Sequence, residues 1–229
     1  MDRQPNKTDV YLEIGKKRTF AGATEWPGWC RSGGDEKSAL RALFDYGPRY
    51  ARALKLSGIE FNIPMDETVF AVSERLEGNA TTDFGAPAIT PSSDNRSLEA
   101  AELQRLQTLL EACWQTFDSV VRSAAGIELR KGPRGGGREL ASIVQHVQES
   151  QAAYIARIGG IINKVEAGEA SHPLEETRRA ILDALAAAAR GEAPEQGPNG
   201  GTRWTPRYFV RRCAWHVLDH AWEIEDRTH

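Results

Sequence analysis

The stretch Arg211–Arg227, RRCAWHVLDHAWEIEDR, holds two of the five histidines in this chain of 229 residues. His216 and His220 are four residues apart, so in an α-helix both side chains lie on one face, one turn from each other. The polar residues of the stretch fall within about 100° of one another on a helical projection, beside an apolar sector; they are Arg212, His216, Asp219, His220 and Glu223. The pattern predicts a helix over about 206–226 whose histidine face points partly into a helical core.

Three more helices are expected upstream, over about 98–124, 138–158 and 173–190. In the first of them apolar residues recur at helical spacing: Leu103, Leu106, Leu110, Trp114, Phe117 and Val121. Four amphipathic helices joined by loops favour an up-down-up-down four-helix bundle over residues 98–229.

The N-terminal part has a different pattern. VYLEIG alternates apolar and polar residues, as a half-buried strand does, and a GKK turn joins it to RTFAGATEW as a β-hairpin partner. Asp35 suits the N-cap of a helix through about Leu56, and TVFAVSERL suits a further strand. Residues 1–77 therefore predict a small αβ domain, and the fold class is α+β.

Residues 78–97, GNATTDFGAPAITPSSDNRS, have no periodicity and are rich in Gly, Pro, Ser, Thr, Asp and Asn. This composition is typical of an interdomain linker. Structureless segments of this length are also often functional, so a lid is the alternative interpretation.

Composition excludes several classes of protein. A formal net charge of −3 argues against non-specific nucleic-acid binding by the whole molecule. No apolar run approaches the roughly 20 residues that cross a bilayer, and the polar N-terminus lacks the apolar region of a signal peptide. The three cysteines are far apart in the sequence, so we expect reduced thiols and a cytoplasmic location. A homodimer is compatible with these features.

A metal site is the sharpest chemical prediction. His216 and His220, joined by His146 from the helix over 138–158, make a three-nitrogen set that zinc, nickel, copper or iron(II) would accept. Three protein ligands leave one coordination position open, as a catalytic site requires. Glu149 and Glu223 each follow a histidine by three residues and are candidates to orient the ligands or to accept a proton. The alternative is a polar, partly exposed helix face.

Two basic segments precede the helices that carry the histidines. ELRKGPRGGGREL, residues 128–140, includes Arg134, and TRWTPRYFVRR, residues 202–212, includes Tyr208 and Arg212. In an up-down-up-down bundle both helices start at the same end, so these three residues are expected to converge on a substrate carboxylate or phosphate. Solvated arginines that pair with surface glutamates are the alternative.

Residues 98–227 resemble the DinB-like superfamily of metal-binding four-helix bundles. In that superfamily one histidine comes from the second helix and an H-x-x-x-H pair from the fourth; here IVQHVQES supplies His146, and AWHVLDH supplies His216 and His220. The resemblance implies a divalent metal, often zinc or nickel. Some members are thiol S-transferases or isomerases that use mycothiol or bacillithiol, and the metal there would bind the thiol as a thiolate.

The stretch FAGATEWPGWCRSGGDEKSALRAL, residues 20–43, resembles HicB-like domains. This resemblance supports a small αβ fold but not a repressor, because no basic DNA-binding helix or ribbon is evident.

Together these features lead us to expect a metal-dependent thiol S-transferase or isomerase that acts on a small anionic electrophile. One rival is a metal-dependent hydrolase, whose activity would need no thiol. Another is a non-catalytic protein that binds a metal or small ligand and recruits a partner through its N-terminal module.

Overall fold

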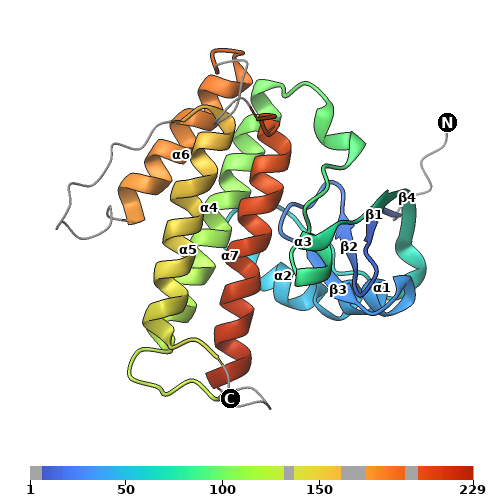
Figure 1. Ribbon diagram of the computed structural model, residues 1–229, viewed down its shortest axis with the longest axis vertical. Helices are drawn as coiled ribbons and strands as arrows, with labels where there is room; N and C mark the ends of the chain where they lie inside the picture. The colour runs from blue at the N-terminus through green and yellow to red at the C-terminus, as the bar shows by residue number, and fades with distance from the viewer. Residues whose placement is uncertain (1–6, 132–136, 161–173, 194–200, 229) are drawn as a thin grey trace. The chain divides into compact units, whose positions relative to one another are not determined.

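The computed structural model describes residues 7–131, 137–160, 174–193 and 201–228. The chain divides into two compact units, Met1–Arg96 and Ser97–His229, and each is described by itself (Figure 1). The first unit contains a β-sheet and short helices, whereas the described part of the second is helical, so the predicted mixture of α and β structure is confirmed. Within the described ranges, none of the helices combines the length and the apolar character needed to cross a membrane.

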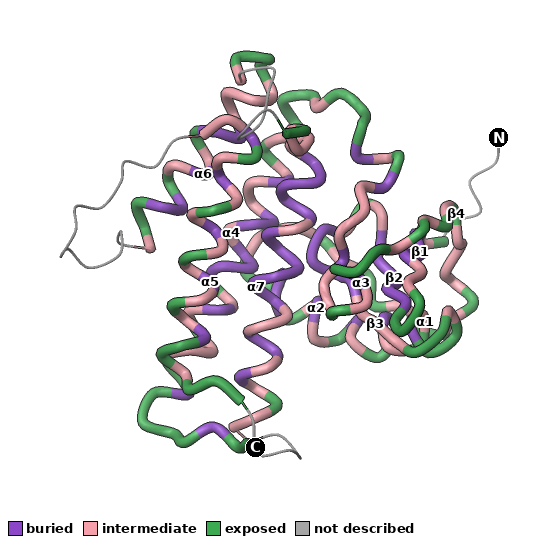
Figure 2. Tube along the Cα trace, viewed as in Figure 1, coloured by how far each residue is buried: buried purple, intermediate pink, exposed green. Residues whose placement is uncertain are grey.

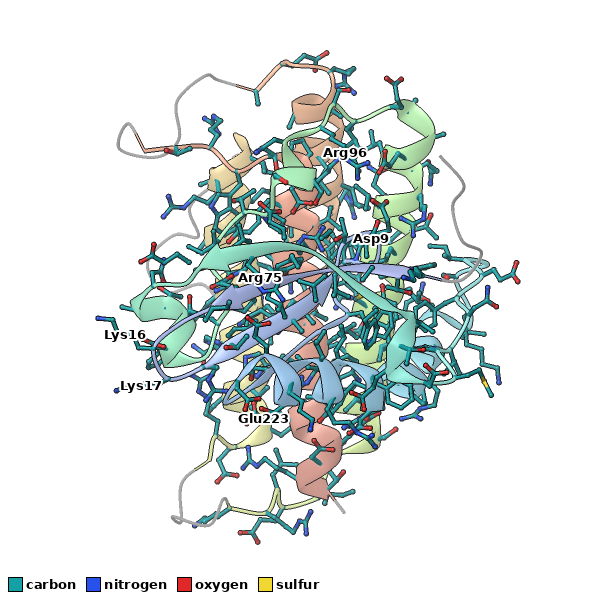
Figure 3. All side chains as sticks on the ribbon, turned by 90° about the vertical axis from the view of Figure 1, so that its right-hand side faces the viewer. Asp9, Lys16, Lys17, Arg75, Arg96 and Glu223 are labelled. Atoms are coloured by element: carbon teal, nitrogen blue, oxygen red, sulfur yellow. The ribbon has the colours of Figure 1, made fainter. Side chains whose placement is uncertain are left out.

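A four-stranded sheet forms the first unit, in the order β3-β2-β1-β4. Its strands are β1 (Thr8–Ile14), β2 (Thr19–Ala23), β3 (Cys30–Gly33) and β4 (Phe70–Glu77). β1 pairs antiparallel with β2 and parallel with β4, and β2 pairs antiparallel with β3. Lys16 and Lys17 lie at the tip of the β1–β2 hairpin (Figure 3). The hairpin and β4 confirm the sequence prediction, but the Gly- and Pro-rich pattern concealed β3.

Two helices, α1 (Glu36–Asp45) and α2 (Gly47–Leu54), follow β3. The Asp35 side chain accepts a hydrogen bond from the Ser38 amide at 2.7 Å, which makes it the N-cap as predicted. The single helix expected through Leu56 is interrupted at Tyr46, where a Gly-Pro pair starts α2. Trp29 stacks on Tyr50 with ring centroids 5.9 Å apart, and both side chains are buried in the core of this unit.

The predicted linker is instead part of the first unit, which extends to Arg96. It contains the helix α3 (Ala80–Phe84) and a 3₁₀ turn, Ser92–Asn95. Glu13 on β1 is fully buried, and its carboxylate accepts hydrogen bonds from the amides of Ala88 and Ile89 at 2.9–3.1 Å and from the Thr82 hydroxyl. A buried carboxylate needs such donors, so it fixes the segment in place. The sequence did not reveal this packing, because a polar segment without periodicity has the same kind of sequence whether it packs against a domain or links two domains.

The contribution of these hydrogen bonds to Glu13 can be tested directly. Glu13→Gln keeps the shape of the side chain but turns one acceptor oxygen into an NH₂ donor that faces other donors. We expect the variant to lose about 1–3 kcal/mol of unfolding free energy, because a buried donor is left unpaired. Urea denaturation measures the loss. Glu74→Gln is the matched control, since Glu74 accepts a hydrogen bond from Ser92 of the same segment but is only half-buried. Equal losses of stability in the two variants would contradict the role of Glu13 in fixing the segment.

Four long helices of the second unit pack side by side (Figure 1). They are α4 (Ala100–Ser123), α5 (Leu140–Ile155), α6 (Leu174–Ala189) and α7 (Pro206–Thr228), with a 3₁₀ turn, Ala156–Ile158, after α5. Buried residues recur along each helix and are most frequent on α7 (Figure 2). The predicted apolar stripe of α4 is largely confirmed: Leu106, Leu110, Trp114 and Phe117 are all buried.

The directions of these helices differ from the up-down-up-down prediction. Arg207 near the start of α7 pairs with Glu102 near the start of α4, so α4 and α7 run parallel. Near the far ends of the same two helices, Ser123 and Glu225 line one cavity of about 440 Å³.

The two middle helices both run against α4 and α7. The Trp204 amide donates to the Arg157 carbonyl at 3.0 Å, so the end of α5 lies beside the start of α7. Arg178 on α6 pairs with Asp118 on α4, and farther along α6 the Leu182 carbonyl accepts from Gln107, which precedes Asp118 on α4. The order is therefore down-up-up-down. Helical periodicity identifies buried faces and carries no information on helix direction.

Candidate metal site

Three histidines from two helices come together in the second unit. His146 belongs to α5, and His216 and His220 belong to α7. One ring nitrogen from each residue lies within 4.8 Å of the other two, and the His146 Nε2 and His216 Nε2 atoms are 3.2 Å apart. The ring centroids are separated by 4.7–5.0 Å. All three residues predicted as metal ligands therefore form one cluster.

The spacing of these nitrogens fits a metal ion. Zinc–nitrogen bonds of about 2.0–2.1 Å in a tetrahedral site place two ligand nitrogens roughly 3.3–3.4 Å apart. The His146–His216 separation is close to this value. The three histidines could therefore hold a metal ion, and its identity does not follow from their spacing.

Burial favours the neutral form of two of the histidines. His216 is 7% exposed, and burial lowers its pKa well below the ordinary 6.5, assisted by the charges of His220, His146 and Arg212. The pKa of His146 is also lowered, first by burial and then by the charge of Arg138. A neutral imidazole offers the lone pair that a metal requires. The electrostatics of the cluster therefore favour the neutral imidazoles that can bind a metal.

Glu223 fixes the ring of His220. Its Oε2 atom lies 2.8 Å from His220 Nδ1, on the C-terminal half of α7 (Figure 3). The hydrogen bond from His220 is the first cause that lowers the pKa of Glu223, so the carboxylate is ionised and only accepts. The contact requires a hydrogen on His220 Nδ1, and the neutral ring with that hydrogen has its lone pair on Nε2. This is the carboxylate–histidine pairing that is common beside metal sites, as predicted for Glu223.

Glu149 has a different environment. It is exposed and accepts a hydrogen bond from the Gln145 side chain at 2.8 Å. Its charge raises the pKa of His146, against the larger effects that lower it. Glu149 therefore acts on the cluster through its charge, whereas Glu223 acts through a hydrogen bond.

An aromatic and cationic group adjoins the cluster on the side toward the start of α7. The Arg212 guanidinium lies 5.8 Å from the Tyr154 ring centroid and 4.9 Å from that of Trp215. The Tyr154 ring is 5.9 Å from the His216 ring and 5.2 Å from Trp204. Burial raises the pKa of Tyr154, which keeps its hydroxyl protonated at neutral pH. The sequence prediction included Arg212 but missed Tyr154, although its position eight residues after His146 places it on a neighbouring part of the same helix surface.

Tyr208 and Arg212, two of the three residues expected to bind a substrate anion, lie within the described residues. Arg134 lies outside the described residues, but Arg130 in the same segment donates to the Asp226 carbonyl at the end of α7. Tyr208 is buried near the start of α7, with its ring 5.1 Å from Trp204. The described residue Arg130 of the first basic segment therefore contacts the end of α7, whereas the second basic segment leads into its start, because α5 and α7 run antiparallel. The charge of Arg212 helps to lower the pKa of His216.

Comparison of the chain with models of protein families, with curated proteins and with solved structures finds no match.

The metal-free protein should lose stability in mild acid. Because His216 has a lowered pKa in the folded state, the unfolded chain binds more protons just below pH 6.5, and stability rises with pH there. We expect the loss to begin as pH falls through about 6.5, with a slope of at most about 1.4 kcal/mol per pH unit from this residue. Urea denaturation in a chelator at pH 7.5 and 5.5 measures it. His216→Gln should have a flatter pH profile; an unchanged profile would contradict the prediction.

Proposed function

We propose that the second unit is a DinB-like four-helix bundle that binds a divalent metal through His146, His216 and His220. The proposed activity is transfer or addition of a low-molecular-weight thiol to a small anionic electrophile, or isomerisation of such a molecule. The observation that carries the proposal is the convergence of three ring nitrogens from α5 and α7 at metal-ligand spacing. Zinc and nickel are the metals that the resemblance favours.

The chemistry of the site supports catalysis more than structural metal binding. Three protein ligands leave a fourth position for a small molecule. A divalent metal at this position lowers the pKa of a bound thiol and makes it nucleophilic at neutral pH. His216 is buried, whereas His146 and His220 keep part of their surface exposed, which supports access of a small molecule to the cluster.

The surrounding residues have separate roles in this proposal. Arg212 binds the anionic group of the electrophile, with Tyr154 beside it as a neutral hydroxyl donor. Glu223 orients His220. Glu149, exposed near His146, accepts the proton that the thiol releases.

The test begins with the full chain, stripped by a chelator and reloaded with zinc or nickel. Metal content is measured by mass spectrometry. Thiol consumption is then followed with glutathione, mycothiol or bacillithiol and an electrophilic dye. Thiol transfer that disappears with the metal and returns on reloading supports the proposal. Bound metal with hydrolysis of esters in the absence of thiol would replace it by a hydrolase, and bound metal without turnover would replace it by a binding protein.

A charge-selective effect on substrate binding is expected from Arg212. Replacing it by glutamine removes the cation beside Tyr154 and Trp215. We expect KM for a carboxylate-bearing electrophile to rise about tenfold, since a charge-assisted hydrogen bond contributes about 1.5–3 kcal/mol. For the matched methyl ester KM should change little. Steady-state kinetics on both substrates measures the difference, and equal effects on the two would rule out the assigned role.

A further inference from the structure

A second ion pair extends the hydrogen bonding of His220 beyond Glu223. The free oxygen of that carboxylate, Oε1, lies 3.0 Å from Arg227 Nη1, one turn farther along α7. Glutamate followed four residues later by a cation is the favourable order for an ion pair on a helix. The Arg227 side chain is only 15% exposed, so water competes weakly for this contact. Arg227 thereby restricts the orientation of the carboxylate that holds His220.

The same arginine joins α7 to the segment Glu128–Lys131, which lies between α4 and α5. Arg227 Nε donates to the Arg130 carbonyl at 2.8 Å, and the Arg130 amide donates to the Arg227 carbonyl at 2.9 Å. Arg130 Nη2 also donates to the Asp226 carbonyl at 2.7 Å, and Leu129 is buried. The segment is therefore attached to the end of α7 by three hydrogen bonds that meet at Arg227 and its neighbour.

We infer that Arg227 is a positioning residue that fixes the metal-binding tautomer of His220 and couples it to the attachment of Glu128–Lys131. The inference rests on the proposed metal site for its function, but its structural part concerns the metal-free protein. Arg227 orients Glu223, the ionised Glu223 accepts the hydrogen of His220 Nδ1, and Nε2 keeps the lone pair. Without Arg227, Glu223 is free to rotate into solvent and His220 can place its hydrogen on either nitrogen.

Thermodynamic linkage gives this arrangement a reciprocal effect. If the attachment of the segment favours the metal-binding form of His220, metal binding must stabilise the attachment to the same extent. The Arg130 amide, which donates to the Arg227 carbonyl, reports this directly. Its hydrogen exchange should become slower when zinc is added.

Gly137 provides an independent way to disturb Arg227. A Cβ atom at Gly137 would lie 2.6 Å from Arg227 Nη2, and the φ angle of Gly137 is +143°, a region that favours glycine. Gly137→Ala therefore moves the guanidinium without changing a residue that touches His220. An effect on His220 that this variant shares with Arg227→Met would indicate transmission through Arg227.

The experiment records nitrogen chemical shifts of ¹⁵N-histidine in the metal-free full chain, which distinguish the two tautomers. Zinc affinity is measured in parallel by competition with a chromogenic chelator. We expect His220 to be Nδ1-protonated in the wild type, and mixed in Arg227→Met and Gly137→Ala. Zinc affinity should fall about tenfold in both variants. Arg227→Lys should retain part of the wild-type zinc affinity and of the Nδ1-protonated form, because an ammonium can still contact Glu223.

Arg122→Met is the matched control, since it removes one exposed arginine from the end of α4. It should change neither measurement. An unchanged tautomer in folded Arg227→Met and Gly137→Ala would overturn the inference; if Arg227→Met does not fold, Gly137→Ala and Arg227→Lys decide. A tautomer change in a protein that binds no zinc would retain the positioning role and refute the proposed function.

Discussion

Replacing His216 by alanine is expected to abolish metal binding at near-stoichiometric concentrations. His216 is the most buried of the three histidines, and its Nε2 atom faces His146 Nε2 at 3.2 Å. Its loss leaves two ligands and a cavity that cannot supply a third. We expect zinc affinity to fall by at least about 100-fold, beyond the usual effect of removing a residue that only orients a ligand. Mass spectrometry of the purified protein and chelator competition measure the loss.

Gln145→Ala is the matched control, because Gln145 precedes His146 on α5 but is exposed and bonded to Glu149. His146→Ala and His220→Ala should resemble His216→Ala. Saturating zinc should raise the melting temperature of the wild type, since a ligand that binds only the folded state stabilises it, and not that of the three variants. One zinc per chain retained by His216→Ala would show that the metal binds elsewhere.

The histidine cluster could be predicted from the sequence because each part of it is local. The four-residue spacing of His216 and His220 fixes their common face, and an amphipathic helix around His146 supplies the third ring. The three-residue spacing from His220 to Glu223 likewise predicted a contact that the structure contains. The same argument was incomplete for Glu149, because spacing does not determine which of several polar neighbours a side chain selects.

Longer-range features were not available from local patterns. Helix direction decides which ends of α5 and α7 meet, and periodicity carries no information on it. Arg130, from the first basic segment, therefore contacts the end of α7, whereas Tyr208 lies near its start. The position of residues 78–96 depends on Glu13, which lies about 70 residues away and reads in sequence as an ordinary polar residue of a strand.

A second large effect is expected from Asp118, far from any proposed chemistry. Both of its carboxylate oxygens lie 2.7 Å from the terminal nitrogens of Arg178, whose side chain is 8% exposed and stacks 5.4 Å from the Trp114 ring centroid. The alternative partner, Glu175, is 3.6 Å away and 79% exposed. Asp118→Ala therefore leaves a guanidinium buried between α4 and α6 without an adequate counter-charge. We expect a loss of about 3 kcal/mol in the free energy of unfolding, measured by urea denaturation.

Two further variants separate the ion pair from its packing. Replacing both partners, Asp118→Leu with Arg178→Met, removes the buried charges together and should recover most of the stability, since a buried pair often contributes little compared with apolar residues of similar size. Glu192→Ala breaks the exposed pair with Arg190 and should give no measurable change. If the double variant is as unstable as Asp118→Ala, the cost arises from lost packing between α4 and α6. If the double variant recovers the stability that Asp118→Ala loses, the loss arises from the unpaired charge of Arg178. The α4–α6 contact then depends on the absence of an unpaired buried charge and not on the ion pair itself.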